Sequence, residues 1–141
     1  MTIYAESSAV LAWLSGEDPG DTVRGLLGDA DTVITSDLTL VECDRVLIRA
    51  TALSGLPEAD AADRRAHLAA AAAHWHILRL GEDVVARARR PFPGEPIRAL
   101  EAIHLASALV ARSAAAGLEL LSLDVRLRAS ARQLGFRVLP L

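Results

Sequence analysis

Four acidic residues lie beside the predicted boundaries between strands and helices in this chain. Glu6 directly follows a short β-prone run near the N-terminus, and Asp124 directly follows an apolar run near the C-terminus. Glu42 and Glu101 lie in the first two turns of predicted helices, inside otherwise apolar segments. A carboxylate among apolar neighbours loses hydration, so its burial must be compensated by a cation or by hydrogen-bond donors. The sequence therefore predicts that these acids share a site with a compensating group.

A divalent metal ion is the simplest compensation for four acids at one edge of a sheet. Mg²⁺ and Mn²⁺ prefer carboxylate and water oxygens, and they keep waters that can serve as nucleophiles. Such a site suits phosphodiester hydrolysis, in which a water held by the metal attacks phosphorus while the metal stabilises charge on the phosphate oxygens. The four acids together therefore indicate a metal-dependent hydrolase.

Each acid also has an ordinary structural role open to it. Glu6 and Asp124 both precede a predicted helix, where a carboxylate can cap the free N–H groups. Glu101 can pair with Arg98, three residues earlier on the same helix. Glu42 is harder to explain in this way because its immediate neighbours are apolar. The metal hypothesis depends on all four acids taken together.

Composition limits the class of protein. Hydrophobic residues make up 52% and charged residues 23%, with only 9 glycines and 6 prolines, which excludes a disordered or repetitive chain. All 15 basic residues are arginines, so chemistry that requires a lysine is excluded. A net charge of −3 argues against a chain that coats nucleic acid by bulk electrostatics.

The expected location is the cytoplasm, without a membrane segment. The single cysteine, Cys43, excludes an internal disulfide and a cysteine-rich zinc site, and it fits a reducing compartment. No run approaches the roughly 20 apolar residues that span a bilayer. The N-terminus lacks the basic start and apolar body of a secretion signal.

The elements that must position the acids alternate between strands and helices. The predicted strands are Thr2–Ala5, Thr32–Thr35, Ile77–Leu80, Leu118–Leu123 and Phe136–Leu139. The predicted helices are Ala9–Leu14, Val23–Leu27, Ser36–Leu53, Glu58–Trp75, Asp83–Arg90, Arg98–Ala116 and Val125–Leu134. Apolar rather than alternating strands separated by helices indicate a parallel sheet covered on both faces. We expect one α/β domain over residues 1–141, with three α/β/α layers, four or five parallel strands and a helical hairpin around Leu38–Trp75.

These segments resemble the PIN-domain ribonucleases, especially the VapC-type toxins of bacterial toxin–antitoxin pairs. The likeness spans nearly the whole chain through four motifs, found in Ile3–Val10, Leu38–Glu42, Arg98–Ser107 and Leu121–Gly135. The third motif is the most specific, because an acid, the run His104-Leu105-Ala106 and a helix recur together in it.

The resemblance implies a metal-dependent endoribonuclease that is the toxin of a toxin–antitoxin pair. It implies catalytic and metal-binding acids at Glu6, Glu42, Glu101 and Asp124. Ser8 or Ser122 would help to hold water or phosphate. The implied cofactor is Mg²⁺ or Mn²⁺, the implied substrate is RNA, and the implied partners are a cognate antitoxin protein and a second copy in a homodimer.

Two positions depart from the family pattern. The usual acid at the first and third positions is aspartate, whereas this chain has Glu6 and Glu101. Glutamate keeps the charge but adds a methylene and a rotatable bond, which changes the distance to a metal. The alternative hypothesis is therefore a catalytically weak PIN-fold binding module that retains antitoxin or RNA binding.

Other polar residues are weaker candidates. His104 lies on an apolar helix face, which is typical of a packed core histidine, and His74 and His76 flank a helix-to-strand junction. Arginines on the hairpin and near the proline-rich loop suit either RNA phosphates or a solvated surface. A receiver domain or aspartyl phosphatase would need an aspartate at the first strand end and a lysine, and the chain has neither.

Overall fold

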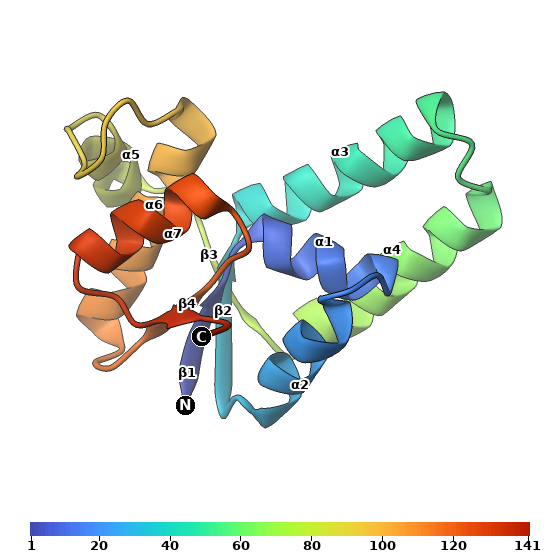
Figure 1. Cartoon of the computed structure of the whole chain (residues 1–141), viewed down its shortest axis with the longest axis horizontal. Helices are drawn as coiled ribbons and strands as arrows, with labels where there is room; N and C mark the ends of the chain where they lie inside the picture. The colour runs from blue at the N-terminus through green and yellow to red at the C-terminus, as the bar shows by residue number, and fades with distance from the viewer.

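A parallel five-stranded sheet in the order β3-β2-β1-β4-β5 organises residues 1–141 in the computed structural model (Figure 1). The strands are β1 (Thr2–Ala5), β2 (Thr32–Ser36), β3 (His76–Leu78), β4 (Glu119–Leu121) and β5 (Val138–Leu139). The helices are α1 (Ser7–Ser15), α2 (Gly20–Asp29), α3 (Asp37–Leu53), α4 (Glu58–Ala72), α5 (Glu82–Ala88), α6 (Ala99–Ala114) and α7 (Val125–Gln133). The predicted α/β class and parallel sheet are confirmed.

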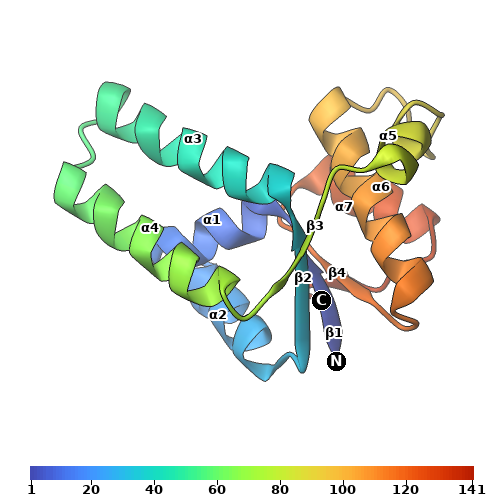
Figure 2. The ribbon, with the colours of Figure 1, turned by 180° about the vertical axis from the view of Figure 1, so that it is seen from behind.

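The sheet separates two groups of helices. Helices α1 to α4 cover one face, and α5 to α7 cover the other, as Figures 1 and 2 show from opposite sides. Strand β1 is central and buried on both faces: Ile3 and Ala5 pack with α1, whereas Tyr4 packs with α6 and α7. This double burial explains why the buried residues Ile3, Tyr4 and Ala5 do not alternate with polar residues.

The predicted helical hairpin is formed by α3 and α4, which project from the sheet (Figure 2). Ser36 caps α3, its hydroxyl accepting a hydrogen bond from the Thr39 N–H. Between the helices, Gly55 has φ +71°, a left-handed conformation that glycine adopts without a steric penalty. Pro57 then precedes the first turn of α4, where its missing N–H costs nothing. None of the seven helices is long and apolar enough to cross a bilayer.

The chain order reverses at the centre of the sheet. Strands β2 and β3 lie on one side of β1, and β4 and β5 lie on the other, so the connections after β1 and β4 leave in opposite directions. In open parallel sheets, a crevice forms at this point beyond the carboxyl ends of the two strands. Glu6 follows β1 here, and Ser122 follows β4.

Tyr4 is expected to make the protein unstable in alkali. It is the only tyrosine, and burial raises its pKa above the usual value of 10.0, outweighing hydrogen bonds to Ser36 and Ser107 that lower it. The stabilisation is fully present below pH 10 and is lost as pH rises, because the unfolded chain ionises first. In an alkaline titration, phenolate absorbance should appear together with loss of the circular dichroism signal. Phenolate forming near pH 10 in a folded chain would contradict this.

Candidate active site

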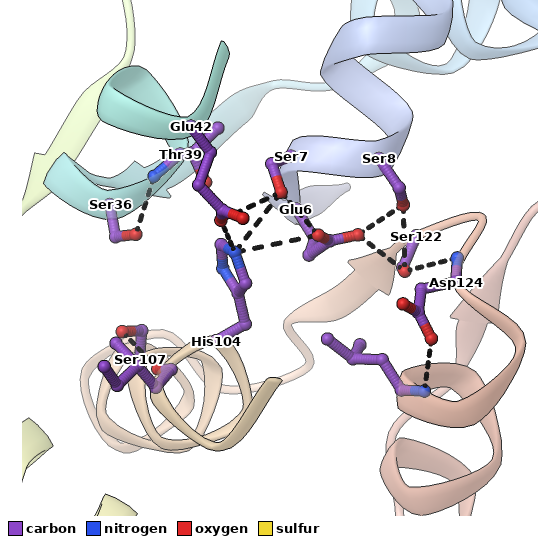
Figure 3. Close-up of polar contacts among 12 residues, drawn as sticks. Glu6, Ser7, Ser8, Ser36, Thr39, Glu42, His104, Ser107, Ser122 and Asp124 are labelled. Carbon is purple, nitrogen blue, oxygen red and sulfur yellow. Dashed lines mark hydrogen bonds and ion pairs between the residues drawn. The ribbon is translucent and has the colours of Figure 1, made fainter. Parts of the chain in front are cut away.

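Glu6 is a buried carboxylate held by three hydroxyl groups. It is 4% exposed and stands directly before α1, but its side chain does not cap that helix. Its Oε1 accepts a hydrogen bond from Ser7 Oγ at 2.7 Å. Its Oε2 accepts from Ser122 Oγ at 2.8 Å and from Ser8 Oγ (Figure 3). No arginine pairs with it, so the three hydroxyl groups supply the hydrogen bonds that a buried carboxylate requires.

Glu42 lies beside Glu6 through contacts that both residues share. Ser7 Oγ, 2.7 Å from Glu6, is also 3.1 Å from Glu42 Oε1. The same Oε1 atom lies 2.5 Å from Nε2 of His104, which is 3.7 Å from Glu6 Oε1 (Figure 3). The two carboxylates that follow β1 and β2 therefore meet at one serine and one imidazole.

The charge of Glu42 is favoured by its neighbours. Burial raises the pKa of this carboxyl, but its interactions with His104 and with the Ser7 hydroxyl lower the pKa by more, so the net direction is downward. The side chain is 24% exposed. Its second oxygen, Oε2, makes no hydrogen bond within the protein, in contrast to both oxygens of Glu6.

Asp124 lies next to this group, but its side chain caps α7. Its Oδ1 accepts a hydrogen bond from the Leu127 N–H at 2.9 Å and caps α7. Its backbone N–H donates to Ser122 Oγ at 3.1 Å, which links it to Glu6 through that serine. The capping role left open for this aspartate is the one that the structure shows.

Glu101 caps its own helix and makes no contact with the other acids. Its carboxylate accepts a hydrogen bond from the Arg98 backbone N–H at 3.1 Å and closes the first turn of α6. The structure thus brings together Glu6 and Glu42, whereas Glu101 and Asp124 cap helices that begin at the same edge of the sheet. No three aspartate, glutamate, histidine or cysteine side chains stand in an arrangement that could hold a metal ion.

Two residues in this group were absent from the predicted site, Ser7 and His104. Sequence analysis placed His104 in the core, and it is 2% exposed, but its ring contacts both glutamates. Its spacing from Glu101 was an available signal, because residues three apart on a helix share a face. The α6 side chain that contacts both glutamates is therefore that of His104, about one turn after Glu101.

Arg128 fixes the turn that carries Ser122. Its Nη1 donates to the carbonyl of Ser122 at 2.6 Å and to that of Leu139 at 2.8 Å. Its Nη2 donates to the carbonyl of Pro140 at 2.7 Å. The ends of β4 and β5 are therefore tied together next to the carboxylate of Glu6.

Comparison with known proteins identifies the family. The family model described as the PIN domain matches residues 3–133. The chain belongs to the PIN-domain family. This PIN domain is 34% identical to Ribonuclease VapC35 of Mycobacterium tuberculosis over 139 residues, which cover 96% of this chain and 94% of that protein. The expected resemblance to VapC-type members is confirmed.

Solved structures of low sequence identity share the fold of this PIN domain. VapC20 of Mycobacterium tuberculosis, described as a sarcin-ricin loop cleaving toxin, matches with a TM-score of 0.62 at 20% identity, covering 90% of this chain and 93% of its own. A toxin–antitoxin complex from Klebsiella pneumoniae matches with a TM-score of 0.59 at 18% identity, covering 86% of each chain. At these identities, the likeness establishes the architecture of this PIN domain.

Proposed function

We propose that this PIN domain is a divalent-metal-dependent endoribonuclease and the toxin of a toxin–antitoxin pair. The observation that supports this best is the pairing of Glu6 and Glu42 at the carboxyl edge of the sheet, in a chain 34% identical to a ribonuclease. The Klebsiella pneumoniae toxin–antitoxin complex supports an antitoxin partner and VapC20 supports an RNA substrate. A homodimer and a cytoplasmic location stay predictions.

The donor chemistry of the paired glutamates fits Mg²⁺ or Mn²⁺. Magnesium sites commonly use one or two carboxylates and complete their coordination with waters and substrate phosphates. Glu42 would contribute its unpaired Oε2, and the adjacent Glu6 would contribute the second charge. Asp124 and Glu101 each use one carboxylate oxygen for a helix cap, which leaves one oxygen of each side chain without a partner in the protein. Ser8 and Ser122 would act by holding Glu6, to which both donate.

The residues of the chain have separate tasks in this proposal. When bound, the divalent ion supplies a polarised water for attack on phosphorus and stabilises charge on the phosphate oxygens. Ser7 keeps the two carboxylates adjacent by lying between them. Ser8 and Ser122 hold the Glu6 carboxylate in place by donating hydrogen bonds to its Oε2. Antitoxin binding would place a basic side chain against these acids.

The proposed reaction predicts the chemistry of the cut ends. Incubation of the purified protein with RNA and Mn²⁺ or Mg²⁺ should give 5′-phosphate and 3′-hydroxyl ends, because water rather than the ribose 2′-hydroxyl is the nucleophile. EDTA should stop cleavage, and added Mn²⁺ should restore it. End-labelling and mass spectrometry of the fragments provide the measurement. Products with 2′,3′-cyclic phosphate would show that the proposed mechanism is wrong.

The second candidate function is a PIN-fold binding module with little or no catalysis. The capping of Glu101 and Asp124 favours it, because only two of the four expected acids meet. The same assay separates the two functions. A module of this kind would bind RNA or the antitoxin, but it would leave RNA intact even with excess Mn²⁺.

A further inference from the structure

His104 occupies a buried position between the two glutamates and the central strand. Its Nε2 lies 2.5 Å from Glu42 Oε1 and 3.3 Å from Ser7 Oγ. Its Nδ1 lies 3.4 Å from the hydroxyl of Tyr4 on β1. The imidazole therefore bridges α6, α3, α1 and β1 at the point where the acidic residues meet (Figure 3).

The neighbours of the ring determine which nitrogen holds its proton. An ionised carboxylate only accepts hydrogen bonds, so Nε2 must donate to Glu42. Nδ1 is then free to accept from the Tyr4 hydroxyl, a donor that burial keeps protonated. A neutral imidazole with its proton on Nε2 satisfies both partners.

This hydrogen bond divides the two oxygens of Glu42 between two tasks. Oε1 accepts from both His104 and Ser7, whereas Oε2 has no partner in the protein. Without His104, the carboxylate would keep only Ser7, whose hydroxyl has one proton and also lies near Glu6. Repulsion from Glu6 would then favour rotation of the partly exposed Glu42 toward solvent.

We propose that His104 is a positioning residue that holds Glu42 against Glu6 so that one carboxylate oxygen stays available to a divalent cation. Tyr4 fixes the tautomer that this task requires. In this chain, α6 thus contributes the imidazole of His104 to the site. Glu101, about one turn earlier, caps the first turn of the same helix. The inference rests on the proposed function, because the cation belongs to that proposal.

The test measures Mn²⁺ binding to the tag-free protein by calorimetry. His104→Ala should weaken Mn²⁺ binding about 10- to 100-fold, the usual loss when a group that orients a metal ligand is removed. His104→Gln should recover most of the affinity, since its amide N–H can donate to Glu42. His74→Ala is the matched control, because His74 is exposed and lies outside the site. Circular dichroism checks that each variant is folded.

A second readout concerns the imidazole itself and needs no metal. Long-range ¹H–¹⁵N spectra should show His104 with its proton on Nε2, and Tyr4→Phe should move the ring toward a tautomer mixture. A proton on Nδ1, or wild-type Mn²⁺ affinity in folded His104→Ala, would overturn the positioning role while leaving the nuclease proposal intact. Wild-type protein that neither binds Mn²⁺ nor cleaves RNA would overturn both.

Discussion

Glutamine in place of Glu42 is expected to lower the rate of RNA cleavage by at least about a hundredfold, beyond the usual loss for a group that only orients a ligand. The substitution keeps the size of the side chain, and the amide oxygen can still accept the hydrogen bond from His104. The amide nitrogen, however, would replace a carboxylate oxygen, and an NH₂ group is a donor that repels a cation. The measurement is kcat/KM on an RNA oligonucleotide at saturating Mn²⁺.

Glu17→Gln is the matched control for this prediction. Glu17 is exposed between α1 and α2, and its side chain forms no hydrogen bond or ion pair, so the same chemical change should leave cleavage unaltered. The two variants together separate loss of charge at the site from loss of net charge. Glu42→Gln with wild-type cleavage would remove this glutamate from the proposed machinery.

Glu6→Asp is expected to lower cleavage at least about tenfold, because small displacements of a catalytic group are costly. The family pattern has aspartate here, but this structure is built for the longer side chain: Ser7, Ser8 and Ser122 donate to its two oxygens. Shortening the side chain would withdraw the carboxylate from these donors. Loss of hydrogen bonds to a buried charge should also reduce the free energy of unfolding by about 1–3 kcal/mol.

Glu101→Asp provides the contrast, since it also restores the usual family acid. Its carboxylate serves the first turn of α6, so the change should alter the free energy of unfolding by less than about 1 kcal/mol and leave cleavage near wild type. Urea denaturation and the same cleavage assay measure both effects. Increased activity in Glu6→Asp would mean that the longer side chain displaces the cation and that the serines do not set its position.

The periodicity of the sequence was sufficient to predict the order of strands and helices. The three buried residues of β1, Ile3 to Ala5, carry no charged or small polar side chain because both faces of the strand are covered, and this pattern was visible without the structure. The same pattern placed Glu6 and Asp124 directly after two strands of a parallel sheet, whose carboxyl ends lie at one edge. That β1 and β4 are neighbours, and that Ser122 rather than Asp124 contacts Glu6 at 2.8 Å, was shown only by the structure.

The roles of Glu101 and Asp124 were not decidable in the same way. Each acid near a helix start has two possible partners: a backbone N–H three residues away and a group across the site. The local partner is used at 3.1 Å for Glu101 and 2.9 Å for Asp124. His104 posed the opposite problem, because a histidine on an apolar helix face is buried whether it contacts alkyl groups or carboxylates. Only the folded structure, in which His104 contacts Ser7 of α1 and Glu42 of α3, shows which neighbours it has.

The link through Arg128 makes the first acid of the site depend on a distant part of the sequence. Both paired carboxylates lie within residues 1–42, but Ser122, which donates to Glu6, is fixed by an arginine that also binds the carbonyls of Leu139 and Pro140. Folding of β1 to β3 alone would therefore bring the two acids into the chain's core without the hydroxyl that Arg128 holds in place. The full donor set of Glu6 requires that β4 and β5 have paired.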